Sequence, residues 1–246
     1  MTDDKRMGLT GHLSELRRCI VISLIGVGVG FGAVWNFTDP VLAFLQGPIQ
    51  PVQEKLVIIA PTEAFFTQLK VAFLAGFLLS LPLILHQVWS FVSPGLFQKE
   101  RAFTFPFIVL STLCFLIGAA FAFFVVMPFG IRFLVGYAGA AFTPSITIGN
   151  YISFTIRMLL VFGAVFELPL ATFLLTRFGF LTPSTLSKNR RYAIVLMFVG
   201  AALLTPPDVF TQLLMAGPLL GLYEISIVTS RMALRQRELR QATSES

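Results

Sequence analysis

Two long uncharged runs constrain this chain more than any other feature. They are Val71–Gln98, with 28 residues, and Ala102–Ile131, with 30 residues. A helix needs roughly 20 consecutive apolar residues to cross a bilayer. Both runs are therefore predicted to span a membrane, and the stretch Phe91–Arg101 at their junction is predicted to be a short connection at one membrane surface.

The composition favours a multispanning membrane protein. The 246 residues are 56% hydrophobic and 12% charged, with a mean hydropathy of +0.83, whereas soluble domains carry about 25% charged residues. The net charge of +6 does not indicate nucleic-acid binding, because the charged residues fall at the ends of the apolar runs.

We expect an all-α fold in a single integral membrane domain, residues 1–246, with six transmembrane helices. The predicted spans cover about residues 19–37, 62–88, 103–129, 150–178, 192–206 and 209–226, between an N-terminal tail, 1–18, and a C-terminal tail, 227–246. The last two apolar runs are short, since 15 residues of helix reach about 22 Å against a hydrocarbon core of about 30 Å. Prolines at positions 82, 106, 169 and 218 predict kinked helices.

The distribution of basic residues predicts the orientation. Fourteen Lys and Arg residues fall in the two tails and in the two connections on the same side, whereas the opposite loops hold only Lys55 and Arg132. Cytoplasmic segments carry the excess of basic residues. Both termini are therefore expected in the cytoplasm.

Catalytic and metal-binding patterns are not found in the sequence. HExxH and GxSxG motifs are absent, so a metalloprotease or a serine hydrolase would lack its basic parts. The two cysteines, Cys19 and Cys114, lie inside predicted spans, and His86 has no nearby Ser or Cys motif. We expect a protein that is not an enzyme and that needs no cofactor or metal.

Glu167 is the most anomalous residue, because apolar residues flank it on both sides. A charge at the bilayer centre costs about 2.5–3.5 kcal/mol on insertion scales. Two interpretations stay open: an intramembrane polar site for a proton, an ion or a partner's side chain, or a protonated carboxyl bonded to a neighbouring helix. A proton-coupled small-solute transporter that uses Glu167 is the alternative function, although the chain lacks the internal repeat common in such proteins.

Two further carboxylates, Glu15 and Glu100, fall on the predicted cytoplasmic side, next to arginines. Each could form a local ion pair, or both could line a cation-binding lip. A carboxylate accepts a guanidinium through two parallel hydrogen bonds, so such a lip would prefer Arg over Lys. In the last hairpin, Thr205 and Gln212 could bond a partner's membrane helix or each other's helix.

Five segments in order resemble the TatC family, the multispanning receptor subunit of the twin-arginine protein translocase. They are HLSELR (12–17), FVSPGLFQKE (91–100), FFVVMPFG (123–130), FELP (166–169) and LLTPPDVFTQ (203–212). The resemblance implies six helices in a cupped, glove-like arrangement in the bacterial inner membrane. It also implies recognition of twin-arginine signal peptides on folded cargo and export driven by the proton-motive force, without nucleotide.

The resemblance also implies roles for individual residues. It assigns signal-peptide binding to Leu13, Glu15, Arg17, Phe91, Pro94 and Glu100. It marks Pro48 in the first outer loop, Glu167 on the concave face, and Thr205 and Gln212 as the docking edge for TatA-like and TatB-like single-span partners in an oligomeric complex. The N-terminal motif often has another Arg two places after the first; here Cys19 stands there and Arg18 precedes it.

Overall fold

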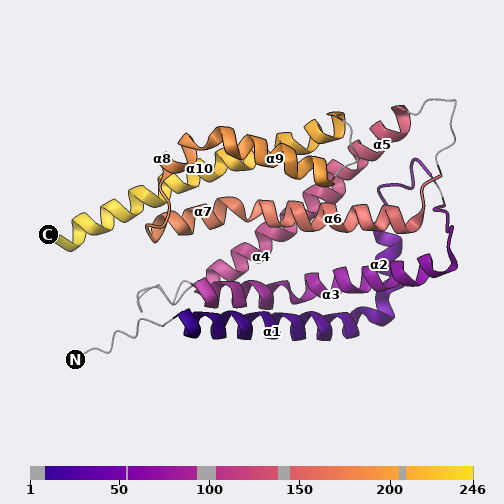
Figure 1. Ribbon diagram of the computed structural model, residues 1–246, viewed down its shortest axis with the longest axis horizontal. Helices are drawn as coiled ribbons and strands as arrows, with labels where there is room; N and C mark the ends of the chain where they lie inside the picture. Colours follow the sequence, from indigo (N-terminus) through magenta and orange to yellow (C-terminus); the bar gives the residue numbers. More distant parts are fainter. Residues whose placement is uncertain (1–8, 54, 93–103, 138–144, 205–208, 246) are drawn as a thin grey trace. The chain divides into compact units, whose positions relative to one another are not determined.

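The computed structural model describes residues 9–53, 55–92, 104–137, 145–204 and 209–245 (Figure 1). These residues are helical apart from turns and one isolated bridge between Val57 and Thr147, so the all-α prediction is confirmed for them. In chain order the elements are α1 (Leu9–Val34), η1 (Trp35–Phe37), α2 (Thr38–Leu45), α3 (Pro61–Val92), α4 (Thr104–Phe121), η4 (Ala122–Val126), α5 (Met127–Tyr137), α6 (Ile148–Phe166), α7 (Leu168–Arg177), α8 (Pro183–Lys188), α9 (Arg190–Leu204) and α10 (Val209–Glu245).

Five helical segments within the described residues are long and apolar enough to cross a membrane. They are Leu13–Leu45, Pro61–Phe91, Phe105–Tyr137, Ile148–Arg177 and Gln212–Leu239. Helix α9, with 15 residues, reaches only about 22 Å. The protein is therefore a multi-pass membrane protein, as its composition predicts.

Contacts within the chain group it into two compact units. The first unit is Met1–Phe44 with Phe65–Thr112, and the second is Leu45–Ala64 with Leu113–Ser246. The first unit thus holds α1 and most of α3, and the second holds α5 to α10. The segment between α2 and α3 belongs to the second unit although it joins two helices of the first.

Small residues bring α1 and α3 together in the first unit, where Figure 1 shows them side by side. The Ser80 hydroxyl donates to the Gly26 carbonyl at 2.7 Å. A Cβ atom on Gly30 would lie 2.5 Å from the carbonyl oxygen of Gly76, so only glycine permits this approach. Close backbone contact through small residues is the usual way that membrane helices pack.

The rest of α1 is covered by little of the protein. Large apolar side chains such as Leu24, Ile25 and Val29 are exposed, Leu24 by 63%, and a Cβ on Gly28 would meet no atom within 4 Å. An exposed apolar helix face is expected for a segment that faces lipid.

The helix of the first predicted span, about residues 19–37, does not end with that span. The chain stays helical through η1 and α2 to Leu45. Pro40 falls in the first turn of α2, where a missing N–H breaks no helical hydrogen bond. The Thr38 hydroxyl donates to the Trp35 carbonyl at 3.0 Å and so holds the junction.

The third predicted span, about residues 103–129, is followed by more helix and not directly by a loop, because α5 continues to Tyr137. Pro128 lacks an N–H, and the chain accommodates it by widening into the π-helical turn Ala122–Val126, in which the Met127 N–H donates to the Ala122 carbonyl. Ile131 then packs in the interior and supports the continued helix. Residues 138–144 lie outside the described part.

Helix α10 runs without interruption to Glu245, over 37 residues, and so extends well beyond residue 226, where the last predicted span ends. Ile227, Ser230 and Ala233 are buried, so the segment that was expected to be a polar tail has a face that packs on the protein.

Hydroxyl groups line the buried seam between α7 and α10 in the second unit. The Thr172 hydroxyl lies 3.2 Å from the Ser226 carbonyl, and the Thr229 hydroxyl donates to the Pro169 carbonyl at 3.0 Å. The hydroxyls of Thr176 and Ser230 are 2.6 Å apart. The seam therefore joins the two helices by polar contacts in surroundings that water does not reach.

Thr176→Val should lower the free energy of unfolding by about 1 kcal/mol, because hydrogen bonds between membrane helices contribute about 0.6–2 kcal/mol. The valine keeps the volume and removes the bond to Ser230. Unfolding in detergent micelles would measure the change. Thr112→Val is the control, since the Thr112 hydroxyl donates to Ile108 of its own helix; equal losses in both variants would contradict a role for the seam.

Candidate functional site

A cavity of about 230 Å³ lies between α1 and α3 in the first unit, at the end where α1 begins and α3 finishes. Its lining comes from both helices: Glu15, Arg18, Cys19, Ile22, His86, Gln87, Ser90 and Phe91.

The glycine contacts explain why these residues meet. Gly30 lies against Gly76, and Gly26 lies against Ser80. The same antiparallel register, continued by about two turns, places Cys19 opposite Gln87, and one turn further it places Glu15 opposite Phe91. Close to this end of α3, the indole N–H of Trp89 donates to the Ser111 hydroxyl at 3.3 Å and fixes the helix on α4.

Glu15 is the acceptor of this cavity. The residue is half-buried, and its Oε2 atom is shielded from solvent with no hydrogen-bond partner among the described residues. A buried acceptor without a partner costs about 1–3 kcal/mol, and more when it is charged. The geometry therefore favours a ligand that brings hydrogen-bond donors to this carboxyl.

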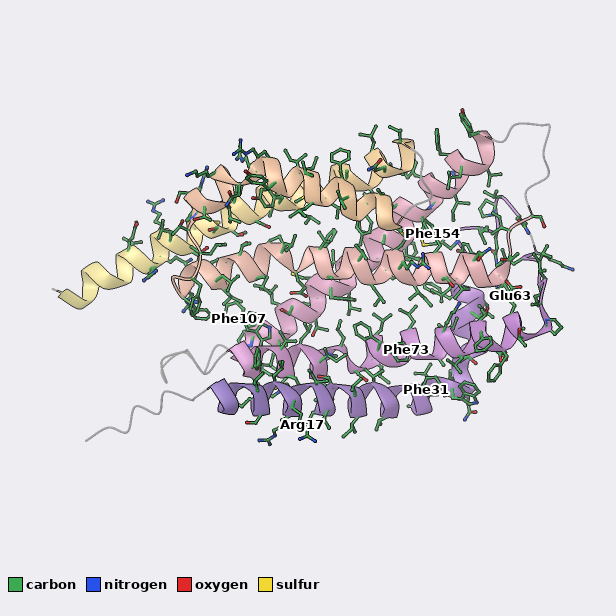
Figure 2. All side chains as sticks on the ribbon, in the orientation of Figure 1. Arg17, Phe31, Glu63, Phe73, Phe107 and Phe154 are labelled. Carbon is green, nitrogen blue, oxygen red and sulfur yellow. The ribbon has the colours of Figure 1, made fainter. Side chains whose placement is uncertain are left out.

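Of the six residues predicted to bind a signal peptide, Glu15 and Phe91 line the cavity. Leu13 and Arg17 are exposed on α1 and do not line it; Figure 2 shows Arg17 on the side of α1 away from α3. Pro94 and Glu100 lie outside the described residues. The local ion pair between Glu15 and a neighbouring arginine, one of the two sequence interpretations, is not among the ion pairs of the described residues.

Six of the lining residues were not singled out as site residues in the sequence: Arg18, Cys19, Ile22, His86, Gln87 and Ser90. The His86 Nδ1 atom lies 3.4 Å from the Gln87 amide nitrogen. Three polar residues within five positions near the end of an apolar helix were a signal that could have found them. The Glu15 carboxyl, an amide, a hydroxyl and the Phe91 ring suit a planar cation with several N–H groups, whereas the Arg18 guanidinium in the same lining opposes one by its like charge.

Glu167 lies at a break between α6 and α7, within the membrane-crossing segment Ile148–Arg177. Pro169 occupies the second position of α7, where it cannot donate a hydrogen bond to the preceding turn. The Glu167 N–H donates to the Ala164 carbonyl at 3.2 Å, and its own carbonyl accepts from Ala171 at 2.8 Å. Its Oε1 atom is shielded from solvent.

Of the two predicted docking residues, the structure describes Gln212, which lies on α10 in the hairpin with α9. The Gln212 side-chain amide donates to the Phe198 carbonyl at 3.0 Å, so the structure has the bond within the hairpin that the sequence left as one of two interpretations. Thr205 lies outside the described residues. Helix α9 exposes several large apolar side chains: Tyr192, Ile194, Val195, Leu196 and Val199.

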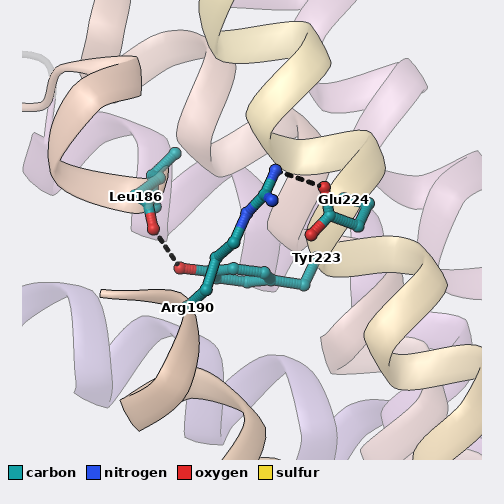
Figure 3. Close-up of polar contacts among 4 residues, drawn as sticks. All are labelled: Leu186, Arg190, Tyr223 and Glu224. Atoms are coloured by element: carbon teal, nitrogen blue, oxygen red, sulfur yellow. Dashed lines mark hydrogen bonds and ion pairs between the residues drawn. The ribbon is translucent and has the colours of Figure 1, made fainter. Parts of the chain in front are cut away.

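Polar contacts join α8 and α9 to α10 where α9 begins, at the end of the hairpin away from its turn (Figure 3). Arg190 and Glu224 form an ion pair at 2.8 Å, and the Tyr223 hydroxyl donates to the Leu186 carbonyl at 2.8 Å. Both charged side chains are about half exposed, and an exposed pair contributes about 0–1 kcal/mol. The contact therefore fixes geometry more than it adds stability.

Pro48 is buried in the turn that follows α2 and belongs to the second unit. As for metals, no group of three or more His, Cys, Asp or Glu side chains in the described part of the chain is placed to hold an ion.

Comparison with known proteins identifies the family. The family model for the Sec-independent protein translocase protein (TatC) matches residues 11–218. TatC of Carboxydothermus hydrogenoformans is 45% identical over 230 residues, which cover 93% of this chain and 95% of the relative. TatC of Aquifex aeolicus is 39% identical over 236 residues, which cover 94% and 98%.

Solved structures give the same result. A crystal structure of the twin-arginine translocase receptor TatC superimposes with a TM-score of 0.83 at 38% identity, covering 90% of this chain and 99% of that chain. A second crystal structure of that receptor, in DDM, has a TM-score of 0.82 at 39% identity and covers 89% and 99%. The chain belongs to the TatC family of Sec-independent protein translocase proteins.

Proposed function

We propose that this chain is the translocase subunit that binds twin-arginine signal peptides of folded proteins at the cytoplasmic face. The observation that carries the proposal is the cavity between α1 and α3, in which the Glu15 carboxyl has a buried oxygen without a hydrogen-bond partner among the described residues. As a component of a protein translocase, the chain is a transport subunit rather than an enzyme.

The chemistry of the cavity supports arginine as the ligand. A guanidinium offers five N–H donors in a plane and pairs with a carboxylate through two bonds, whereas an ammonium is a point charge. Gln87 and Ser90 offer further acceptors, and Phe91 offers a ring face. Leu13, Arg17, Pro94 and Glu100 complete the proposed peptide-binding surface, with Glu100 accepting the second arginine.

The proposed topology has six spans, made by the five long apolar segments and the shorter α9. Both termini face the cytoplasm of a bacterial inner membrane, because basic residues concentrate in the tails and in the connections on the same side. Six helices in a glove-like arrangement would let the apolar part of a signal peptide enter a concave face.

The partners proposed for this subunit are single-span proteins of the TatA and TatB type. They would dock along the hairpin of α9 and α10, near Thr205 and Gln212, where α9 exposes five large apolar side chains. Glu167 is proposed as an intramembrane polar site that such a partner or the signal peptide contacts, with export driven by the proton-motive force. The alternative, a proton-coupled solute transporter, rests on Glu167 alone.

The purified protein in detergent should bind a twin-arginine signal peptide at least about tenfold more tightly than the same peptide with both arginines replaced by lysine. The loss reflects the missing bidentate geometry, since each charge-assisted hydrogen bond contributes about 1.5–3 kcal/mol. Fluorescence anisotropy of a labelled peptide measures both affinities. Equal affinity for the two peptides would contradict the receptor proposal and direct attention to proton uptake at Glu167 in proteoliposomes.

A further inference from the structure

The segment Leu45–Ala64, here called the strap, is fastened to the beginning of α6. Val57 forms a parallel bridge with Thr147, in which the Val57 N–H donates to the Ile146 carbonyl at 3.1 Å and the Ile148 N–H donates to the Val57 carbonyl at 3.0 Å. The Gln53 side chain adds two bonds to the backbone of one residue: its Oε1 atom accepts from the Ile146 N–H at 3.0 Å, and its Nε2 group donates to the Ile146 carbonyl at 3.4 Å.

Glu63 closes the other end of the strap. One carboxyl oxygen accepts from the Gly149 N–H in the first turn of α6 at 2.8 Å, and the other accepts from the Ile59 N–H of the strap at 3.0 Å. Figure 2 shows Glu63 at the start of α3 near the beginning of α6. A Cβ on Gly149 would lie 2.7 Å from the Glu63 oxygen, so the carboxyl fills the space that a larger residue would need.

The first turn of the strap is packed as well as bonded. Leu45 and Pro48 are buried, and Ile49 is only 1% exposed. The buried Tyr151 hydroxyl donates to the Leu45 carbonyl at 2.7 Å. Four described residues of the strap, Leu45, Gln53, Val57 and Glu63, are thus bonded to the segment Ile146–Tyr151 at the beginning of α6.

We propose that the strap is a fixed part of the second unit throughout transport and not a gate, with Glu63 and Gln53 as the positioning residues that hold it, and Pro48 within it, on α6. Segments that open during function come from the least stable parts of a protein. Release of the strap would break all the bonds above and expose the buried side chains of Leu45, Pro48 and Ile49. The transport readout rests on the proposed function, whereas the structural readout does not.

Hydrogen exchange tests the positioning role of Glu63. In Glu63→Ala, the Gly149 and Ile59 amides should exchange at least about tenfold faster than in the unmodified protein, because each loses a charge-assisted hydrogen bond. Asp39→Ala is the matched control, since Asp39 belongs to α2 and its carboxyl accepts only from the Gln68 side chain among the described residues, at 3.3 Å. Unchanged exchange in Glu63→Ala would overturn the role of Glu63.

A disulfide tests whether the strap must open. Bridged residues on neighbouring strands lie about 5 Å apart, within the range that a disulfide spans, so Val57→Cys with Thr147→Cys should cross-link on oxidation. The oxidised protein should export cargo within about twofold of the same variant after reduction. Failure to cross-link, or loss of export on oxidation that reduction restores, would overturn the proposal.

The two proposals can fail separately. Binding of the twin-arginine peptide is measured on the same oxidised and reduced samples. Binding that ignores the arginines would refute the receptor function and leave the exchange result for the strap intact. Normal binding with export lost on oxidation would refute only the fixed strap.

Discussion

Glu15→Gln should weaken binding of a twin-arginine signal peptide at least about 100-fold. The glutamine keeps the volume and one carbonyl acceptor, but it removes the negative charge and presents N–H groups to the guanidinium. Truncating one partner of a buried, hydrogen-bonded charge pair costs about 2–5 kcal/mol, and 1.4 kcal/mol is tenfold in affinity. The measurement is titration of a labelled peptide with the purified variant.

Glu238→Gln is the matched control, because it makes the same change at an exposed carboxyl of α10 in the second unit. It should leave peptide affinity within about twofold. A second check uses the lysine peptide, whose weaker binding should differ less between the Glu15 variant and the unmodified protein. Unchanged peptide affinity in Glu15→Gln would mean that Glu15 does not bind the signal peptide and that the cavity does not serve as the arginine site.

The long apolar runs predict which segments cross the membrane, but they do not predict where the helices end. Hydropathy identifies the part of a helix that contacts lipid, and it gives no information on a part of the same helix that lies outside the membrane. Residues 227–245 are polar overall and still continue α10, because the face with Ile227 and Ala233 packs on the protein. In the same way, α5 continues past Phe129 once a π-helical turn has absorbed Pro128.

The sequence predicts part of the break between α6 and α7 at Glu167. Pro169 predicts a bend, but whether one span bends or divides into two helices depends on how the neighbouring turn is satisfied. Here the Glu167 N–H turns back to Ala164 and a new helix begins at Leu168. The hydroxyl seam between α7 and α10 could not be predicted from hydropathy. Thr172 and Thr176 lie in a predicted span, and Ser230 lies in the predicted C-terminal tail.

The sequence also predicts only some of the residues that line the cavity between α1 and α3. Glu15 and Phe91 could be named from sequence motifs, whereas His86, Gln87 and Ser90 become its neighbours only through the register between α1 and α3. That register is set by glycine contacts in the middle of both helices, and glycine spacing alone does not say which face packs. Gly28 and Gly30 look equivalent in the sequence, but only Gly30 meets α3.

This difference predicts opposite results for one substitution at two neighbouring positions. Gly30→Ala should lower the free energy of unfolding by about 1–3 kcal/mol, because the new Cβ would stand 2.5 Å from the Gly76 carbonyl oxygen and the helices must separate. Gly28→Ala should be neutral or stabilising by up to about 1 kcal/mol, since its Cβ meets nothing within 4 Å and alanine favours a helix.

Peptide affinity should also fall in Gly30→Ala and stay unchanged in Gly28→Ala. Separation of α1 from α3 displaces Glu15 from Gln87 and Phe91, so Gly30→Ala should bind a twin-arginine peptide at least about tenfold more weakly, by loss of the close geometry that a bidentate bond needs. Gly76→Ala should act alike, as its Cβ would overlap the Phe31 backbone nitrogen. Unfolding and peptide titration in the same detergent measure both effects. Equal behaviour of Gly28→Ala and Gly30→Ala would mean that the α1–α3 register does not build the cavity.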